Sequence, residues 1–247
     1  IGADLVEIRG CTLVPQDWVD GDSFRVRTPE GEMHTVRLYG VDCMESSAND
    51  KSDARRLWAQ RRYFGISGVA GSAEEAVEFA MKFGAEATAL RRELTSKPFT
   101  LWTAFADGRG SSRHKRIYAF VLLHDGRDLG GILVERGLAR AFGVYRSAWN
   151  GLSAADYKAD IKDLEIVAAK KGIGIWQHTD WDKFIDDRRA QRAEDRLVAV
   201  TLGQKKLPKE AIDINQASQD DLMRLPGIGK VKASRIIQGR PFKSVAE

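Results

Sequence analysis

Two segments decide the fold of this chain: DGDSF at residues 20–24 and VRLYGVDCME at residues 36–45. In both, apolar residues alternate with polar ones. The sequence PEGE at 29–32 lies between them and carries the proline and glycine that favour a turn. The pattern predicts a β-hairpin.

Charged side chains gather at the ends of this predicted hairpin. Asp22 enters the first strand, Arg37 lies within the second, and Asp42 and Glu45 follow it. Because paired strands can bring their ends to one edge of a sheet, three carboxylates and a guanidinium can converge there. Carboxylate oxygens suit a hard cation such as calcium or magnesium, and an arginine fork suits a phosphate. A solvated hairpin with acidic loops is the alternative that these residues leave open.

The motifs resemble the staphylococcal nuclease family. The similarity continues through RIYAFV at 116–121, DGRDLGGILVERGLARAF at 125–142 and AAKKGIGIW at 168–176, in the family's order, over about residues 12 to 177. The resemblance implies an α+β fold, in which helices pack on a five-stranded β-barrel of the OB type. It also implies hydrolysis of nucleic acid.

The resemblance implies a calcium site. Asp22, Asp42 and the main-chain carbonyl of Cys43 would supply its oxygens, and magnesium or manganese is less favoured. Met44 stands where the family has proline, so we expect a looser loop before Glu45.

Three residues correspond to the family's catalytic groups. Arg37 and Arg116 match the arginines that hold the phosphate and offset the charge on its oxygens. Glu45 matches the glutamate that activates or positions the attacking water. A carboxylate near a metal is expected to stay ionised at neutral pH.

Substrate-binding residues are also implied. Tyr145 matches a tyrosine of the nucleotide pocket, but its usual companion is replaced by Gly143, so base stacking should be weaker. The loop before Arg116 departs from the family pattern. Its cations His114 and Lys115 are expected to help hold the substrate.

The segment 46–82 is longer than the loop that the family usually has there. Ser52 begins a predicted helix, and its arginines predict either a solvated face or a nucleic-acid clamp. These arginines are Arg55, Arg56, Arg61 and Arg62. A capping box at Ser72 and Glu75 predicts a second helix, to about Thr95.

The whole chain is expected to divide into three parts. These are a catalytic domain at 1–180, a charged connecting helix with a linker at 181–210, and a tail at 211–247. Further predicted elements are strands at 97–105 and 116–123, a short helix that ends near Gly137, and helices at 153–171 and 181–200. We expect Trp176 to pack against the barrel.

The tail resembles a helix-hairpin-helix module of the competence-protein type, and we expect it to be incomplete because the chain stops where a second hairpin would follow. Gly227 and Gly229 free the backbone to turn, so that its amides can face a phosphate, and Lys230 and Lys232 add positive charge. Such contacts position a protein on DNA without reading its sequence. A helical hairpin that serves protein contacts is the alternative.

The charge distribution points to the same tail. The net charge is +4, and residues 204–247 carry nine Lys or Arg against five Asp or Glu, so the whole excess lies there. No run of about 18 apolar residues predicts a membrane span. With only Cys11 and Cys43, one bridge is possible, but two free buried thiols are favoured.

These observations predict a metal-dependent, largely sequence-nonspecific nuclease, with an endonuclease mode favoured. DNA is the expected partner, single- or double-stranded, and RNA is left open. The resemblance favours a secreted or periplasmic protein. The alternative is a non-catalytic nucleic-acid-binding protein on the same barrel, although such relatives lose the acidic and arginine positions. A protein-binding scaffold leaves those residues unexplained.

Overall fold

The computed structural model describes residues 4–16, 20–48, 51–108, 115–202, 212–223, 225, 228 and 230–242. The chain divides into two compact units, residues 1–189 and residues 190–247. The first unit combines a β-sheet with packed helices, which confirms the predicted α+β class.

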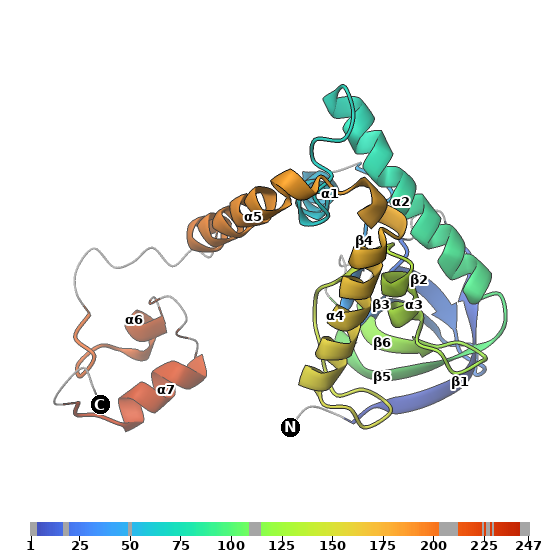
Figure 1. Ribbon diagram of the computed structural model, residues 1–247. Coiled ribbons are helices and arrows are strands. Elements are labelled where there is room, and N and C mark those ends of the chain that lie inside the picture. Colours follow the sequence, from blue (N-terminus) through green and yellow to red (C-terminus); the bar gives the residue numbers. More distant parts are fainter. Residues whose placement is uncertain are drawn as a thin grey trace. The chain divides into compact units, whose positions relative to one another are not determined.

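Five strands of the first unit form a sheet that closes on itself (Figure 1). They are β1 (Val6–Val14), β2 (Ser23–Arg27), β3 (Met33–Leu38), β5 (Phe99–Asp107) and β6 (Arg116–Leu122). Their order is β1-β2-β3-β6-β5, and β5 pairs back onto β1. Every pairing is antiparallel except that of β3 with β6, which is parallel.

The predicted hairpin is confirmed as β2 and β3, in which Ser23 pairs with Arg37. The connecting turn is closed by a hydrogen bond from the Thr28 amide to the Glu32 carbonyl, at 2.9 Å. Gly31 adopts a φ of +91°, which glycine tolerates better than other residues. The first strand begins at Val6, where it pairs with β5.

A second, two-stranded sheet was not predicted. It joins β4 (Val41–Cys43) to β7 (Ala139–Ala141), with Asp42 opposite Arg140. Both strands are short, so their apolar pattern gives little signal. This sheet brings segments that are far apart in the sequence together beside the hairpin.

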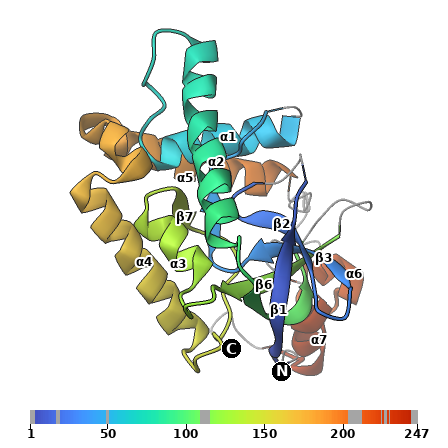
Figure 2. The same ribbon diagram turned by 90° about the vertical axis from the view of Figure 1, so that its right-hand side faces the viewer.

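The first unit also contains helices, which leave the β1 side of the barrel open (Figures 1 and 2). They are α1 (Lys51–Tyr63), α2 (Ala73–Leu94), α3 (Leu129–Glu135), α4 (Ala154–Lys171), the 3-10 helix η1 (Gly174–His178) and the start of α5 (Trp181–Leu202). The capping box of α2 is confirmed, since the Glu75 amide donates to the Ser72 hydroxyl and the Glu75 carboxylate accepts from the Ser72 amide. In both views α3 and α4 lie side by side.

The tryptophan expected on the barrel belongs to one hydrophobic core with barrel residues and also contacts the inserted segment. Trp176 is buried, and its ring centroid lies 4.8 Å from that of Phe64, directly after α1. Trp181 stacks on it from the start of α5. The segment inserted after the hairpin therefore has an apolar anchor of its own. Cys11 and Cys43 are buried and free, as favoured.

The second unit contains α6 (Gln219–Met223) and α7 (Lys230–Gln238). Leu222 and Ala233 are buried between them, and the Asn215 side chain exchanges two hydrogen bonds with the backbone of Phe242. Over the residues described in both units, no helix combines the length and the apolar character that a membrane crossing requires.

Candidate active site

The structure brings Asp22, Arg37 and Asp42 together. The Arg37 guanidinium lies 3.0 Å from Asp42 Oδ1 and 3.6 Å from Asp22 Oδ2. Asp22 precedes β2, Arg37 lies in β3 and Asp42 in β4, so the hairpin and its continuation place all three. Both carboxylates are buried.

The two carboxylates differ in their surroundings. Burial raises the pKa of Asp22, and Arg37 offsets this only in part. Burial also acts to raise the pKa of Asp42, but the guanidiniums of Arg140 and Arg37 outweigh it and lower this pKa. Arg140 Nε lies 2.8 Å from Asp42 Oδ2. Arg140 was not identified from the sequence, because its pairing depends on the unpredicted contact between β4 and β7.

Arg116 joins this cluster through a serine. Its Nη1 donates to Ser23 Oγ at 3.3 Å, and Ser23 Oγ in turn donates to Asp22 Oδ1 at 3.0 Å. In the parallel ladder Arg37 pairs with Tyr118, two residues after Arg116. Since residues two apart in a strand share a face, both predicted phosphate-binding arginines lie on one face of the sheet.

Glu45 does not face solvent but pairs with an arginine of the inserted helix. Arg56 donates two hydrogen bonds to the Glu45 carboxylate, from Nε to Oε1 at 2.7 Å and from Nη2 to Oε2 at 2.9 Å. Burial raises the pKa of Glu45 to about 8, although Arg56 acts to lower it. This value is higher than expected for a carboxylate near a metal.

Gln60 is a second residue of α1 that reaches the cluster. Its Nε2 donates to Asp42 Oδ2 at 3.0 Å and to the Cys43 carbonyl at 2.7 Å. Its Oε1 accepts the Glu45 amide at 2.9 Å. Gln60 follows Arg56 by four residues, so the two share a helix face. The chain around Met44 is therefore held by specific contacts and is not the loose loop expected.

The metal site implied by the resemblance can be tested against these contacts. The oxygens of Asp22, Asp42 and Cys43 have the chemistry that calcium prefers. However, both Asp42 oxygens and the Cys43 carbonyl already accept hydrogen bonds from Arg37, Arg140 and Gln60. Among the described residues, no group of three or more His, Cys, Asp or Glu could hold a metal ion.

Comparison with family models gives two matches. The model described as Staphylococcal nuclease homologue matches residues 35–178, more than half of the chain. The chain belongs to the staphylococcal nuclease family. The model of the helix-hairpin-helix motif matches residues 208–247, as the tail's sequence predicted. A search of curated proteins finds no match.

The predicted substrate-binding residues of the staphylococcal nuclease domain lie in different places. Tyr145 packs its ring against Gly40 and near Tyr157, and its hydroxyl is buried without a hydrogen-bond partner in the described structure. Burial raises the pKa of Tyr145 to about 12. Lys115 is exposed directly before β6, whereas His114 lies outside the described residues.

The arginines of α1 do not act as one set, so neither the solvated face nor the clamp describes all of them. Arg55 is exposed, Arg61 donates to the Ser67 carbonyl at 3.0 Å, and Arg62 lies 4.0 Å from the ring centroid of Trp58. Of these four arginines, Arg56 is the one that donates to Glu45 in the candidate site.

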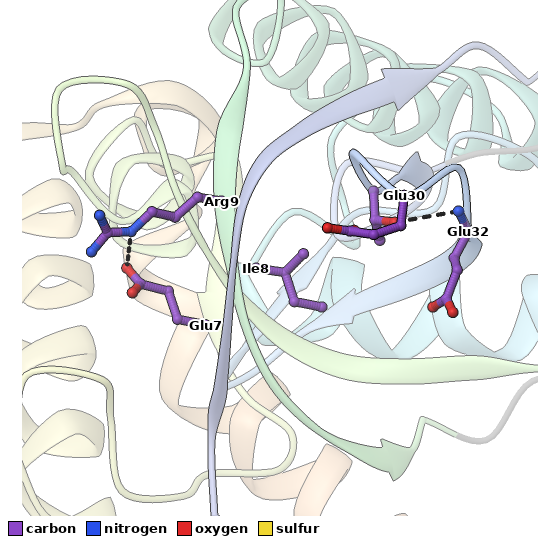
Figure 3. Close-up of a pocket in the computed structure, with 6 residues that line it drawn as sticks. Glu7, Ile8, Arg9, Glu30 and Glu32 are labelled. Carbon is purple, nitrogen blue, oxygen red and sulfur yellow. Dashed lines mark hydrogen bonds and ion pairs between the residues drawn. The ribbon is translucent and has the colours of Figure 1, made fainter.

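A surface cavity of about 540 Å³ lies apart from this site, on β1 and the turn between β2 and β3 (Figure 3). Its lining residues are Glu7, Ile8, Arg9, Thr28, Glu30 and Glu32. Arg9 is paired with Glu7 at 2.9 Å, so the remaining glutamates leave the cavity acidic. An acidic lining repels a phosphate, so this cavity does not suit the substrate of a nuclease.

Of the four tail residues predicted to bind DNA, the structure describes the two lysines. Lys230 begins α7, and Lys232 is exposed on it. Gly227 and Gly229 lie outside the described residues. The helix-hairpin-helix match supports nucleic-acid binding by this unit.

Proposed function

We infer that this protein is a nuclease that hydrolyses phosphodiester bonds of DNA, with little dependence on base sequence. The observation that carries this is the placement of Arg37 and Arg116 on one face of the sheet, beside the buried carboxylates of Asp22 and Asp42. The family match supports nuclease chemistry in general. The closed five-stranded sheet supports a barrel of the OB type.

The two arginines favour an anion between them. Burial and the neighbouring Arg37 lower the pKa of Arg116. A phosphodiester carries the opposite charge to these two arginines, and the planar guanidinium fork matches its oxygens. In the reaction both arginines would stabilise the extra negative charge that develops on the phosphate as water attacks.

Glu45 is the proposed group that activates or positions this water. For that role its carboxylate must accept a proton or hydrogen bond from water in addition to the two hydrogen bonds from Arg56. We also expect a requirement for a divalent ion, calcium being favoured because the candidate ligands are all oxygens.

The experiment incubates the full chain with circular single-stranded DNA, linear duplex DNA or RNA. Each substrate is tested with calcium, with magnesium and with excess chelator. We expect cleavage of DNA circles with calcium, which establishes an endonuclease. Full activity in chelator would refute the metal requirement, and cleavage of linear ends alone would refute the endonuclease mode.

One observation favours a second candidate function, a nucleic-acid-binding protein without catalysis. Arg56 holds both oxygens of Glu45, the group that would have to act on water. This candidate predicts that DNA binds but stays intact under every metal condition. The same incubations, followed by a binding measurement, separate the two functions.

A further inference from the structure

Arg56 is the residue of the inserted helix that contacts the proposed water-activating group. Two of its nitrogens donate to the two oxygens of Glu45, at 2.7 and 2.9 Å. A paired contact of this kind fixes both the position and the plane of a carboxylate, whereas one hydrogen bond leaves the group free to turn. The Arg56 guanidinium therefore sets the direction in which the Glu45 oxygens point.

The arginine is itself held in place. Its Nη2 also donates to Asp53 Oδ1 at 2.6 Å, three residues earlier on the same helix. Leu57, the next residue, is buried, and the Tyr63 hydroxyl at the end of the helix donates to the Glu165 carboxylate at 2.7 Å. Because the helix is fixed to the domain by these contacts, Arg56 meets Glu45 as a preorganised donor.

Arg56 does not occupy the whole Glu45 carboxylate. An ionised carboxylate offers about four lone-pair positions on its two oxygens, and Arg56 fills two of them. Among the described residues, no other side chain donates to these oxygens. The Glu45 side chain also keeps 9% of its surface exposed. A water molecule can therefore contact Glu45 while Arg56 holds the carboxylate.

Glu45 is tied to the part of the site that is proposed to hold the phosphate. Gln60 accepts the Glu45 amide and donates to Asp42, and Asp42 in turn lies 3.0 Å from the Arg37 guanidinium. Asp22 is the main cause that raises the pKa of Arg37, and the charge of Glu45 acts in the same direction. Water held by Glu45 would thus lie near a phosphate held by Arg37.

We propose that Arg56 is a positioning residue of the nuclease reaction, which aims the Glu45 carboxylate at the attacking water. This inference rests on the proposed function and on the role that it gives Glu45. Arg56 acts through Glu45, and its assigned contacts are with the protein and not with the phosphate. The inserted helix thereby supplies an orienting group that the barrel strands do not contain.

The test is a double-mutant cycle on the full chain, with the DNA substrate and metal ion that give the unmodified chain its fastest turnover. Arg56→Ala should lower kcat about tenfold or more and leave KM within about twofold, because Glu45 loses its orientation while the barrel arginines still bind phosphate. In a chain that already carries Glu45→Gln, the same change should lower kcat less than about twofold, since no carboxylate remains to be aimed. The matched control is Arg55→Ala, an exposed position on the same helix, which should leave kcat unchanged.

Two results of the cycle would overturn the inference. An equal loss of kcat with and without Glu45→Gln would mean that Arg56 acts independently of Glu45, on the fold or on the phosphate. A rise in KM without a loss of kcat would make Arg56 a substrate-binding residue.

A second variant guards against loss of folding in the first. Arg56→Lys keeps a positive charge beside Glu45 but cannot make two parallel contacts with the carboxylate. It should keep the melting temperature of the unmodified chain within about 4 °C and still lose kcat about threefold or more. A normal kcat in Arg56→Lys would show that the paired contact is not needed and would overturn the inference.

The inference and the proposed function fail in different ways. If the unmodified chain cleaves no DNA with any metal ion, the nuclease assignment fails and the role of Arg56 fails with it. If the unmodified chain cleaves DNA but Glu45→Gln keeps a normal kcat, or the losses in the cycle are equal, the assignment stands and the positioning role is refuted.

Discussion

The site is built from two regions that hold their side chains in different ways. The barrel side places Asp22, Arg37 and Arg116 through strand pairing, in which the backbone ladder fixes each position. The inserted helix α1 places Arg56 and Gln60 through apolar anchors and individual hydrogen bonds. The barrel side carries the charged cluster, and the helix side holds the Glu45 carboxylate and the Cys43 carbonyl with hydrogen bonds.

The largest expected effect lies on the barrel side. Arg37→Ala or Arg116→Ala should lower kcat about 10²–10³-fold, the cost of losing one charge-stabilising donor, about 2.7–4 kcal/mol. Lysine should restore little, because a point charge does not reproduce the bidentate fork. Steady-state kinetics on DNA measure this.

The control for the arginines is Arg27→Ala, an exposed arginine on the neighbouring strand, which should keep normal turnover. Melting curves must accompany the kinetics, since Arg37 also neutralises two buried carboxylates. Near-normal kcat for Arg116→Lys would show that the fork is not needed.

The next effect tests how tightly helix α2 supports the site. A Cβ at Gly84 would lie 2.6 Å from the Glu45 carbonyl oxygen, so Gly84→Ala must displace the backbone that carries Glu45. We expect a loss of about 1–3 kcal/mol in the free energy of unfolding, as for other overpacked sites. Gly68→Ala is the control, because only the end of Lys183 lies within 4.0 Å. Denaturant unfolding that gave equal stabilities for the two variants would contradict the close packing.

A smaller effect is expected on the helix side. Arg56→Ala leaves the buried Glu45 carboxylate without its partner and should lower the free energy of unfolding by about 1–2 kcal/mol. The estimate stays below that for a fully buried pair because the Arg56 side chain is 38% exposed. Arg55→Ala should change stability by about 0.5 kcal/mol or less. Denaturant unfolding measures both variants. Equal losses in the free energy of unfolding for Arg56→Ala and Arg55→Ala would mean that the pair of Arg56 with Glu45 does not stabilise the fold.

The smallest effect on turnover is expected outside both regions. Truncation after Gln204 removes the whole +4 excess but none of the residues of the candidate site. Turnover at saturating DNA should stay within about threefold, while affinity for long duplex falls, and the difference should shrink as salt rises.

Replacing Gly227 and Gly229 with bulkier residues should mimic the truncation, since the hairpin amides could no longer approach a phosphate. A titration of duplex DNA at two salt concentrations measures the affinity of the full chain, the truncated chain and the glycine variants. Equal affinities at low salt would favour protein contacts by the tail.

The barrel side could be predicted from the sequence because its signals are local. Alternation around PEGE at 29–32 defines the hairpin, and the charges at its ends can meet only if the strands pair. The capping box at Ser72 is equally local, since its contacts span three residues. Family resemblance then supplied roles for Arg37 and Arg116, which the structure places on one face.

What the sequence could not determine is the direction in which α1 points its side chains. The sequence pattern does not distinguish the arginines of this helix from one another. In the structure, however, Arg56 contacts Glu45 and Arg55 is exposed. The choice depends on partners distant in sequence, such as Glu165 for Tyr63, which lies 102 residues away. The residue pattern therefore predicted a hairpin and a charged inserted helix, and the family resemblance implied a barrel. Only tertiary packing decided that Gln60 would lie on the oxygens of Asp42 and Cys43, because a buried amide must find its partners wherever the folded chain provides them.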